Sequence, residues 1–239
     1  PQIDLGVYSA GLGIKNTNNA VIVAGIQSIW NKAHLIGSRD LVLVDEAHCI
    51  NPEGEGRYAS MLKDMKVINP KVRLIGLTAT PYRMKEGMIC APDHLLNHIC
   101  YEIGVKELIE EGYLCKLISK RGLNLDFSSC HIKAGEYVEA EVNAILLPVV
   151  SQAIEELLKL SVGRKSILIF CQGIDHAQAV QMGLEERTKE EVGLVTGMTL
   201  PGVRREILER FKQGKLKYVV NVNVLTTGFD APNIDCVVL

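Results

Sequence analysis

The features that this sequence lacks exclude several classes of protein. Its 26 basic and 28 acidic residues give a net charge of −2, so a nucleic-acid site would have to be local rather than a global basic surface. No apolar run is long enough to span a membrane and no signal peptide opens the chain, so we expect no membrane partner and a cytoplasmic location. The seven cysteines form no CxxC pair, which is typical of free thiols in a reducing compartment.

Hydrophobic residues are abundant by comparison. They make up 47% of the 239 residues, which supports packed cores and argues against disorder. The chain starts at Pro1 rather than Met and stops at Leu239, inside an apolar run that we interpret as a strand. We therefore expect this chain to be a piece of a longer protein.

Short apolar runs alternate with segments of helical periodicity along most of the chain. The expected strands are at residues 3–8, 20–25, 41–44, 74–77, 166–170, 192–195, 217–221 and 236–239. Strands and helices that alternate in this way predict parallel sheets in three layers. Residues 116–145 are less regular, so we predict a first α/β domain at 1–115, a linker or insertion at 116–145, and a second domain at 146–239.

Two carboxylates follow the apolar run 41–44, which has the composition of a strand buried on both faces. Open α/β sheets bind ligands just outside the carboxyl ends of their strands, where Asp45 and Glu46 are placed. There Asp45 could hold Mg²⁺ through water, and Glu46 could orient or deprotonate an attacking water. The alternative is a solvated strand end without chemistry.

Hydroxyl groups follow the next strand of the same predicted sheet. Thr78 and Thr80 end the run 74–77, so we expect them at the same edge as the two carboxylates. They could bond to His48 or to a carboxylate and sense the state of a nucleotide. Alternatively, Thr78 only turns the chain before Pro81.

A third polar segment follows the strand at 217–221. Thr226 and Thr227 offer hydroxyls and amides to a phosphate, and Gly228 permits close approach of the backbone. Asp230 could accept a hydrogen bond from a ribose hydroxyl or an arginine. An ordinary βα loop is the alternative interpretation.

Five segments occur in the order expected for superfamily 2 helicases, and the chain resembles that family over essentially its whole length. They are DEAH (45–48), LTATPYR (77–83), SILIFCQ (166–172), LVTG (194–197) and VNVLTTGFDAP (222–232), which match motifs II, III, IV, the TG element and motif V. Within the family the chain looks most similar to RadD-like bacterial DNA-repair helicases, through GIQSI (25–29), ICYE (99–102) and EGYL (111–114).

The resemblance implies two RecA-like domains, the first incomplete at its N-terminus and the second at its C-terminus. It implies ATP and Mg²⁺ as cofactors, with Asp45 binding the metal through water and Glu46 acting as the catalytic base. His48, with Thr78 and Thr80, would couple hydrolysis to movement of nucleic acid.

The resemblance also implies a nucleic-acid partner, DNA rather than RNA, with a single-stranded-DNA-binding protein or another repair protein as a further partner. Gly228 and Asp230 would face the nucleotide from the second domain. The residues implied to touch the nucleic-acid backbone are Gln27, Ser28, Thr196, Gly197, Thr226 and Thr227.

The chain departs from the family pattern in two places. It has no G-x-x-x-x-G-K-[ST] motif, because Gly11-Leu12-Gly13 lacks the lysine and the hydroxyl. It also lacks the arginine-bearing last motif. Arg204, Arg205 and Arg210 lie earlier, on a helix, and we interpret them as a solvated basic face. We therefore predict that this chain alone hydrolyses ATP very slowly or not at all.

Three alternatives to a repair helicase remain open. The motor subunit of a restriction–modification system shares the same motifs, and only flanking domains would separate the two. A non-catalytic nucleic-acid-binding or scaffold chain would explain the missing phosphate loop. A carboxylate metalloenzyme, such as a phosphatase, would need more Asp or His at the strand ends than the sequence offers.

Overall fold

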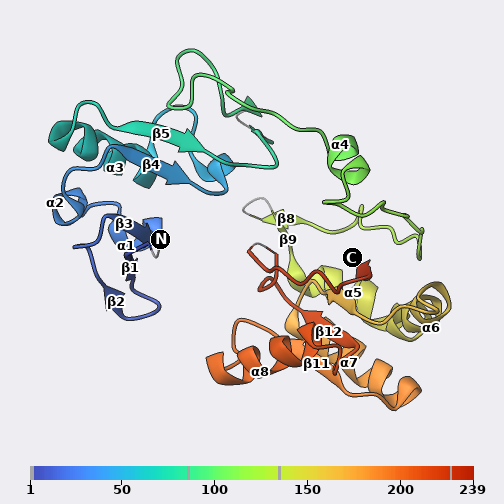
Figure 1. The fold of residues 1–239 in the computed structure, drawn as a ribbon. Coiled ribbons are helices and arrows are strands. Elements are labelled where there is room, and N and C mark those ends of the chain that lie inside the picture. The colour runs from blue at the N-terminus through green and yellow to red at the C-terminus, as the bar shows by residue number, and fades with distance from the viewer. Residues whose placement is uncertain (1–2, 85–86, 134–135, 227) are drawn as a thin grey trace. The chain divides into compact units, whose positions relative to one another are not determined.

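The computed structural model describes residues 3–84, 87–133, 136–226 and 228–239. The chain divides into two compact units, Pro1–Lys116 and Leu117–Leu239 (Figure 1). Both units are mixed α/β with parallel strand pairs, as the sequence predicts. Within the described ranges, no helix is long and apolar enough to cross a bilayer.

The first unit contains two separate sheets with parallel pairing. β1 (Leu5–Ser9) pairs in parallel with β3 (Val21–Ala24) and antiparallel with the short β2 (Ile14–Lys15), which the sequence did not indicate. β4 (Leu41–Val44) pairs in parallel with β5 (Arg73–Gly76). The remaining elements are α1 (Ile26–Ile29), α2 (Ala33–Ile36), the 3₁₀ turn η1 (Ala47–Cys49), α3 (Gly56–Ile68), the hairpin β6 (Tyr82–Arg83) and β7 (Gly87–Met88), and α4 (Val105–Glu110).

Helix α3 contributes to the cores of both sheets of the first unit. Its Met61 packs against the cluster that contains Tyr8 and Ile29, and its Tyr58 packs against the cluster that contains Val44. The opposite face of β4 is open, because Leu43 is 61% exposed. The prediction that strand 41–44 is buried on both faces is therefore wrong: side chains alternate along a strand, and only one set is covered here.

The second unit has a four-stranded parallel sheet in the order β11-β12-β10-β13. The strands are β10 (Ile167–Phe170), β11 (Val192–Val195), β12 (Tyr218–Asn221) and β13 (Cys236–Val238). The helices are α5 (Glu139–Leu146), η2 (Leu147–Val149), α6 (Val150–Leu160), α7 (Ile174–Thr188) and α8 (Pro201–Lys212). The stretch 116–145 contributes the hairpin of β8 (Ile132–Lys133) and β9 (Glu136–Tyr137) and most of α5.

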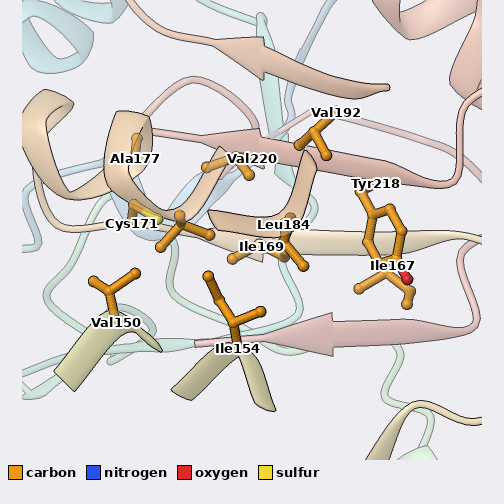
Figure 2. Close-up of a cluster of buried hydrophobic side chains, with 11 residues drawn as sticks. Val150, Ile154, Ile167, Ile169, Cys171, Ala177, Leu184, Val192, Tyr218 and Val220 are labelled. Carbon is orange, nitrogen blue, oxygen red and sulfur yellow. The ribbon is translucent and has the colours of Figure 1, made fainter. Parts of the chain in front are cut away.

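Apolar side chains cover both faces of the second sheet. On one face, Val150 and Ile154 of α6 and Leu184 of α7 pack against strand residues that include Val220 (Figure 2). On the other face, Phe211 of α8 belongs to a cluster with strand residues of the same sheet. This three-layer arrangement explains why every residue of the central strand β12 is buried.

Candidate functional site

The parallel pairing of β4 and β5 brings two predicted segments to one sheet edge. Val44 is in register with Gly76, and the pairing continues one step further because the Leu77 amide donates to the Val44 carbonyl at 2.8 Å. The Ala47 amide then donates to the Leu77 carbonyl at 2.9 Å. The segments that begin at residues 45 and 78 therefore start side by side, which is the arrangement that the sequence predicts.

His48 joins the acidic segment to the threonine segment. Its Nδ1 lies 3.0 Å from Thr78 Oγ1, 3.2 Å from Thr80 Oγ1 and 3.3 Å from Glu46 Oε2. Thr78 Oγ1 also accepts from the Thr80 amide at 3.1 Å, so this residue turns the chain as well as contacting the histidine. One imidazole nitrogen thus contacts a carboxylate and two hydroxyls. We call Glu46, His48, Thr78 and Thr80 the strand-end cluster.

The backbone of Glu46 adopts a left-handed conformation, with φ 50° and ψ 50°. A non-glycine residue with such angles carries strain that its surroundings must hold. The next residue, Ala47, is fully buried and packs against Gly76, where an added Cβ would lie 2.7 Å from the Ala47 Cβ. Glu46 is half-buried, and its amide donates to Asp45 Oδ1 at 2.9 Å. This turn separates an exposed Asp45 carboxylate from a Glu46 carboxylate held near His48.

The metal ligands available at this edge of the sheet fit a magnesium ion that binds together with a nucleotide. Mg²⁺ sites in nucleotide-binding proteins use one or two carboxylates together with waters and substrate phosphates. Asp45 supplies one exposed carboxylate. Across the described part of the chain, no group of three or more His, Cys, Asp or Glu residues could hold a metal by itself.

Gln27 and Ser28 lie on α1 in the same unit, and their side chains have different surroundings. Ser28 Oγ accepts from the Ala10 amide at 3.0 Å, so this hydroxyl closes the turn after β1. Gln27 is exposed, and its Oε1 accepts from Arg57 Nη1 at 2.6 Å. Arg57 is a cation beside a predicted contact residue that the sequence reasoning missed, because 30 residues separate the two positions.

In the second unit, the turn after β11 places Thr196 and Gly197 differently. Thr196 is 7% exposed, its Oγ1 accepts from the Met198 amide at 3.2 Å, and its amide donates to Thr199 Oγ1 at 2.9 Å. Gly197 is exposed, and an added Cβ would meet nothing within 4 Å. The threonine builds the turn, while the glycine presents open backbone.

Arg204 also holds this turn. Its Nη2 donates to the carbonyl oxygens of Thr196 at 3.1 Å and Thr199 at 3.3 Å. The interpretation of three solvated arginines is therefore wrong for Arg204. Arg210 remains at the surface, as that interpretation expects, and there it pairs with both carboxylate oxygens of Glu191 at 2.7 and 2.6 Å. That hydrogen bond from Arg210 lowers the pKa of Glu191.

The segment after β12 is the third predicted element of the site. Thr226 and Asp230 are exposed, and Gly228 has a φ of 68°, the backbone freedom expected of it. Thr227 lies outside the described residues. The Val222 amide donates to the Val195 carbonyl at 3.1 Å, so this segment starts beside the turn after β11.

Two family models match the chain over most of its length. The helicase conserved C-terminal domain matches residues 150–239, and the type III restriction enzyme res subunit matches residues 5–83. The first match covers the main sheet of the second unit, and the second covers the strand-end cluster and Gln27.

Curated relatives align along nearly the whole chain. The putative ATP-dependent helicase IRC3 of Saccharomyces cerevisiae is 26% identical over 100% of this chain and 34% of its own length. The type I restriction enzyme EcoAI endonuclease subunit of Escherichia coli is 24% identical over 84% of this chain and 27% of its own. The chain therefore spans between 27% and 46% of the length of the curated relatives it matches.

Solved helicase structures share the fold. The Mycobacterium smegmatis helicase Lhr, bound to ssDNA and AMP-PNP, aligns with a TM-score of 0.59 at 17% identity, covering 99% of this chain and 31% of Lhr. S. cerevisiae Dbp5, bound to RNA and ADP BeF3, aligns with a TM-score of 0.51 at 15% identity, covering 99% of this chain and 55% of Dbp5. At these identities the likeness establishes the fold alone.

Proposed function

Because this chain belongs to the superfamily 2 helicases, we propose that it forms part of the ATP-driven motor of a nucleic-acid helicase or translocase. The observation that carries this proposal is the strand-end cluster, in which His48 Nδ1 lies within 3.3 Å of Glu46, Thr78 and Thr80. In this cluster the Glu46 carboxylate can take part in hydrolysis, and the threonine hydroxyls can respond by moving the segment after β5. We also propose that this chain is part of a longer protein, and that the motor's substrate and partners are those of the longer protein.

The residues of the first unit divide the chemistry between them. Asp45 would hold a magnesium ion through water, and the ion would supply positive charge to the phosphates of ATP. Glu46 accepts a proton from the attacking water, and its turn fixes the direction of the carboxylate. His48 transmits the position of Glu46 to Thr78 and Thr80, so that the state of the nucleotide shifts the segment after β5.

Nucleic acid binds through backbone and polar groups instead of a broad basic surface. In the first unit, Gln27 and its neighbour Arg57 contact phosphate. In the second unit, the exposed amide of Gly197 and the hydroxyl of Thr226 do so, while the buried Thr196 shapes the turn. Gly228 and Asp230 contact the nucleotide.

We further propose DNA as the track, in a repair role like that of RadD-like helicases, with a single-stranded-DNA-binding protein as a partner. The resemblance of residues 25–29 and 99–102 supports this choice, and Lhr was solved with ssDNA. Dbp5 was solved with RNA, so RNA is the alternative that an experiment must separate.

A restriction–modification motor is the second candidate. The match of residues 5–83 to the type III restriction enzyme res subunit and the likeness to the EcoAI subunit favour it. Both candidates use the same motor chemistry, so the domains that flank the motor in the longer protein decide between them.

The test is ATP hydrolysis by the longer protein without nucleic acid, with single-stranded DNA and with single-stranded RNA of the same sequence. We expect hydrolysis to rise with DNA and to change little with RNA. Stimulation by RNA alone would overturn the DNA assignment. If the longer protein binds DNA but does not hydrolyse ATP, the motor proposal is wrong and the non-catalytic nucleic-acid-binding alternative is favoured.

A further inference from the structure

Asn221, the last residue of β12, is a fully buried polar residue at the edge that carries the second unit's predicted contacts. Its Nδ2 donates to the Ile169 carbonyl of β10 at 3.1 Å. Its Oδ1 accepts from the Leu225 amide at 3.3 Å. One side chain therefore ties the neighbouring strand to the segment that leads to Thr226.

The backbone around Asn221 is tied to both neighbouring strands as well. Its carbonyl accepts from the Cys171 amide, just past β10, at 2.9 Å. The next amide, of Val222, donates to the Val195 carbonyl at the end of β11. Because β12 lies between β10 and β11 in the sheet, Asn221 lies where the loops after all three strands begin.

An amide side chain suits this position for a physical reason. The Leu225 amide needs an acceptor and the Ile169 carbonyl can take a donor, and an asparagine supplies both at once. A buried polar group without a partner costs free energy, so the two bonds favour one conformation of the intervening segment. Asn223, within that segment, has a φ of 51°, and the buried Leu225 packs into the cluster that contains Phe211.

We propose that Asn221 is a positioning residue, which sets residues 222–226 against the strand ends and thereby places Thr226 for contact with nucleic acid. The proposal rests on the function proposed above, because it assigns Thr226 a phosphate contact. Asn221 itself is buried and touches no ligand.

Asn233 provides a matched control in the same unit. Its Nδ2 donates to Ser166 Oγ at 2.8 Å and to the Phe211 carbonyl at 2.9 Å, so it also bridges two segments through an amide. Ser166 precedes β10, so this bridge lies at the end of the sheet opposite to the Asn221 bridge. We expect loss of the Asn233 bonds to lower stability while both hydrogen bonds of the Asn221 side chain remain.

The experiment compares Asn221→Leu, Asn221→Ala and Asn233→Ala in the full 239-residue chain. Asn221→Leu keeps the branched shape and the number of heavy atoms of the side chain and removes both hydrogen bonds. Hydrogen exchange of the Leu225 amide and the affinity for a labelled single-stranded oligodeoxythymidine are measured together. For the Asn221 variants we expect exchange about tenfold faster and affinity about tenfold weaker, the effect of about one lost hydrogen bond. For Asn233→Ala we expect wild-type exchange at Leu225 and wild-type affinity. Its loss of thermal stability should be comparable to that of the Asn221 variants.

Each other outcome has a defined meaning. Wild-type exchange at Leu225 in a folded Asn221 variant, or an equal loss of affinity in Asn233→Ala, would overturn the proposal. So would failure of both Asn221 variants to fold, since the role would then be structural only. If the wild-type chain binds no oligonucleotide, the proposed function fails for this chain, and the exchange of Leu225 alone decides whether Asn221 holds the segment.

Discussion

At the scale of single residues, the function proposed above assigns hydrolysis and its coupling to nucleic acid to different members of the strand-end cluster. Glu46 carries the carboxylate, and His48 connects it to Thr78 and Thr80 through one ring nitrogen. The two functions should therefore respond to different substitutions, and each substitution has its own readout.

We predict that His48→Ala uncouples the longer protein. Hydrolysis without nucleic acid should stay near the wild-type rate, because Asp45 and Glu46 remain. Stimulation by DNA should fall about tenfold, which corresponds to about 1.4 kcal/mol of transition-state stabilisation. Thr78→Val, which removes one hydroxyl partner of the ring, should act in the same direction. Full stimulation in both variants would show that the contacts of His48 do not transmit the signal.

The cysteines offer a second test at the residue scale. Burial raises the pKa of the Cys171 thiol from its ordinary 9.0 to about 12, whereas Cys100 and Cys115 are exposed. A maleimide at pH 8 should label these two thiols and the third exposed thiol, Cys49, quickly, and Cys171 only when the chain unfolds, because the thiolate is the nucleophile. Mass spectrometry of the labelled peptides checks this. Since the folded pKa is raised, this thiol also predicts a loss of stability as the pH rises from 9 toward 12.

At the scale of elements, the open face of β4 should contribute less to folding than the buried core of the same unit. Leu43 is 61% exposed, whereas Leu62 of α3, in the same unit, is 4% exposed. Leu62→Ala should lower the free energy of unfolding by about 2–5 kcal/mol, because it leaves a cavity in the core. Leu43→Ala should change it by no more than about 0.5 kcal/mol, as surface substitutions do.

Urea unfolding followed by tryptophan fluorescence measures both variants. Trp30 is the single tryptophan and lies in the first unit, so the signal reports that unit. A cost for Leu43→Ala equal to that for Leu62→Ala would mean that the open face of β4 is covered in solution.

The sequence was a good guide to elements whose cause is local. Short apolar runs predicted strands 41–44 and 192–195, with the bounds that the structure shows. Burial was harder to predict, because the run 41–44 has the composition of a fully buried strand and yet exposes Leu43. Coverage of a strand face depends on which segments lie above it, and composition does not carry that information.

For the candidate site too, the sequence predicted the features with a local cause and missed those that depend on folding. Two strand-end motifs predicted that His48 and the threonines lie at one sheet edge, because parallel strands end together. Arg57, Arg204 and Asn221 were missed or misread, since their roles depend on partners that the chain brings together only on folding. No motif marks a residue that acts by holding another segment in place.

At the scale of the whole molecule, the chain carries the second motif of a nucleotide-driven motor without its phosphate loop. We predict that the 239-residue chain alone hydrolyses no measurable ATP, and that the protein extended upstream through a G-x-x-x-x-G-K-[ST] segment does. The physical reason is the lysine, which holds the β- and γ-phosphates in such loops. Phosphate release from both proteins, under the same conditions, checks this. Equal turnover by the two proteins would show that the phosphate loop is dispensable here.

The central claim is that the edge formed by β4 and β5 hydrolyses the nucleotide, and one substitution tests it most directly. DNA-stimulated phosphate release by the longer protein is compared for the wild type, Glu46→Gln and the control Glu53→Gln, an exposed carboxylate on the loop before α3. We expect Glu46→Gln to bind ATP and DNA normally and to release phosphate at least about 100-fold more slowly, the usual effect of losing a general base. Glu53→Gln should match the wild type. Turnover at the wild-type rate in Glu46→Gln would contradict the account.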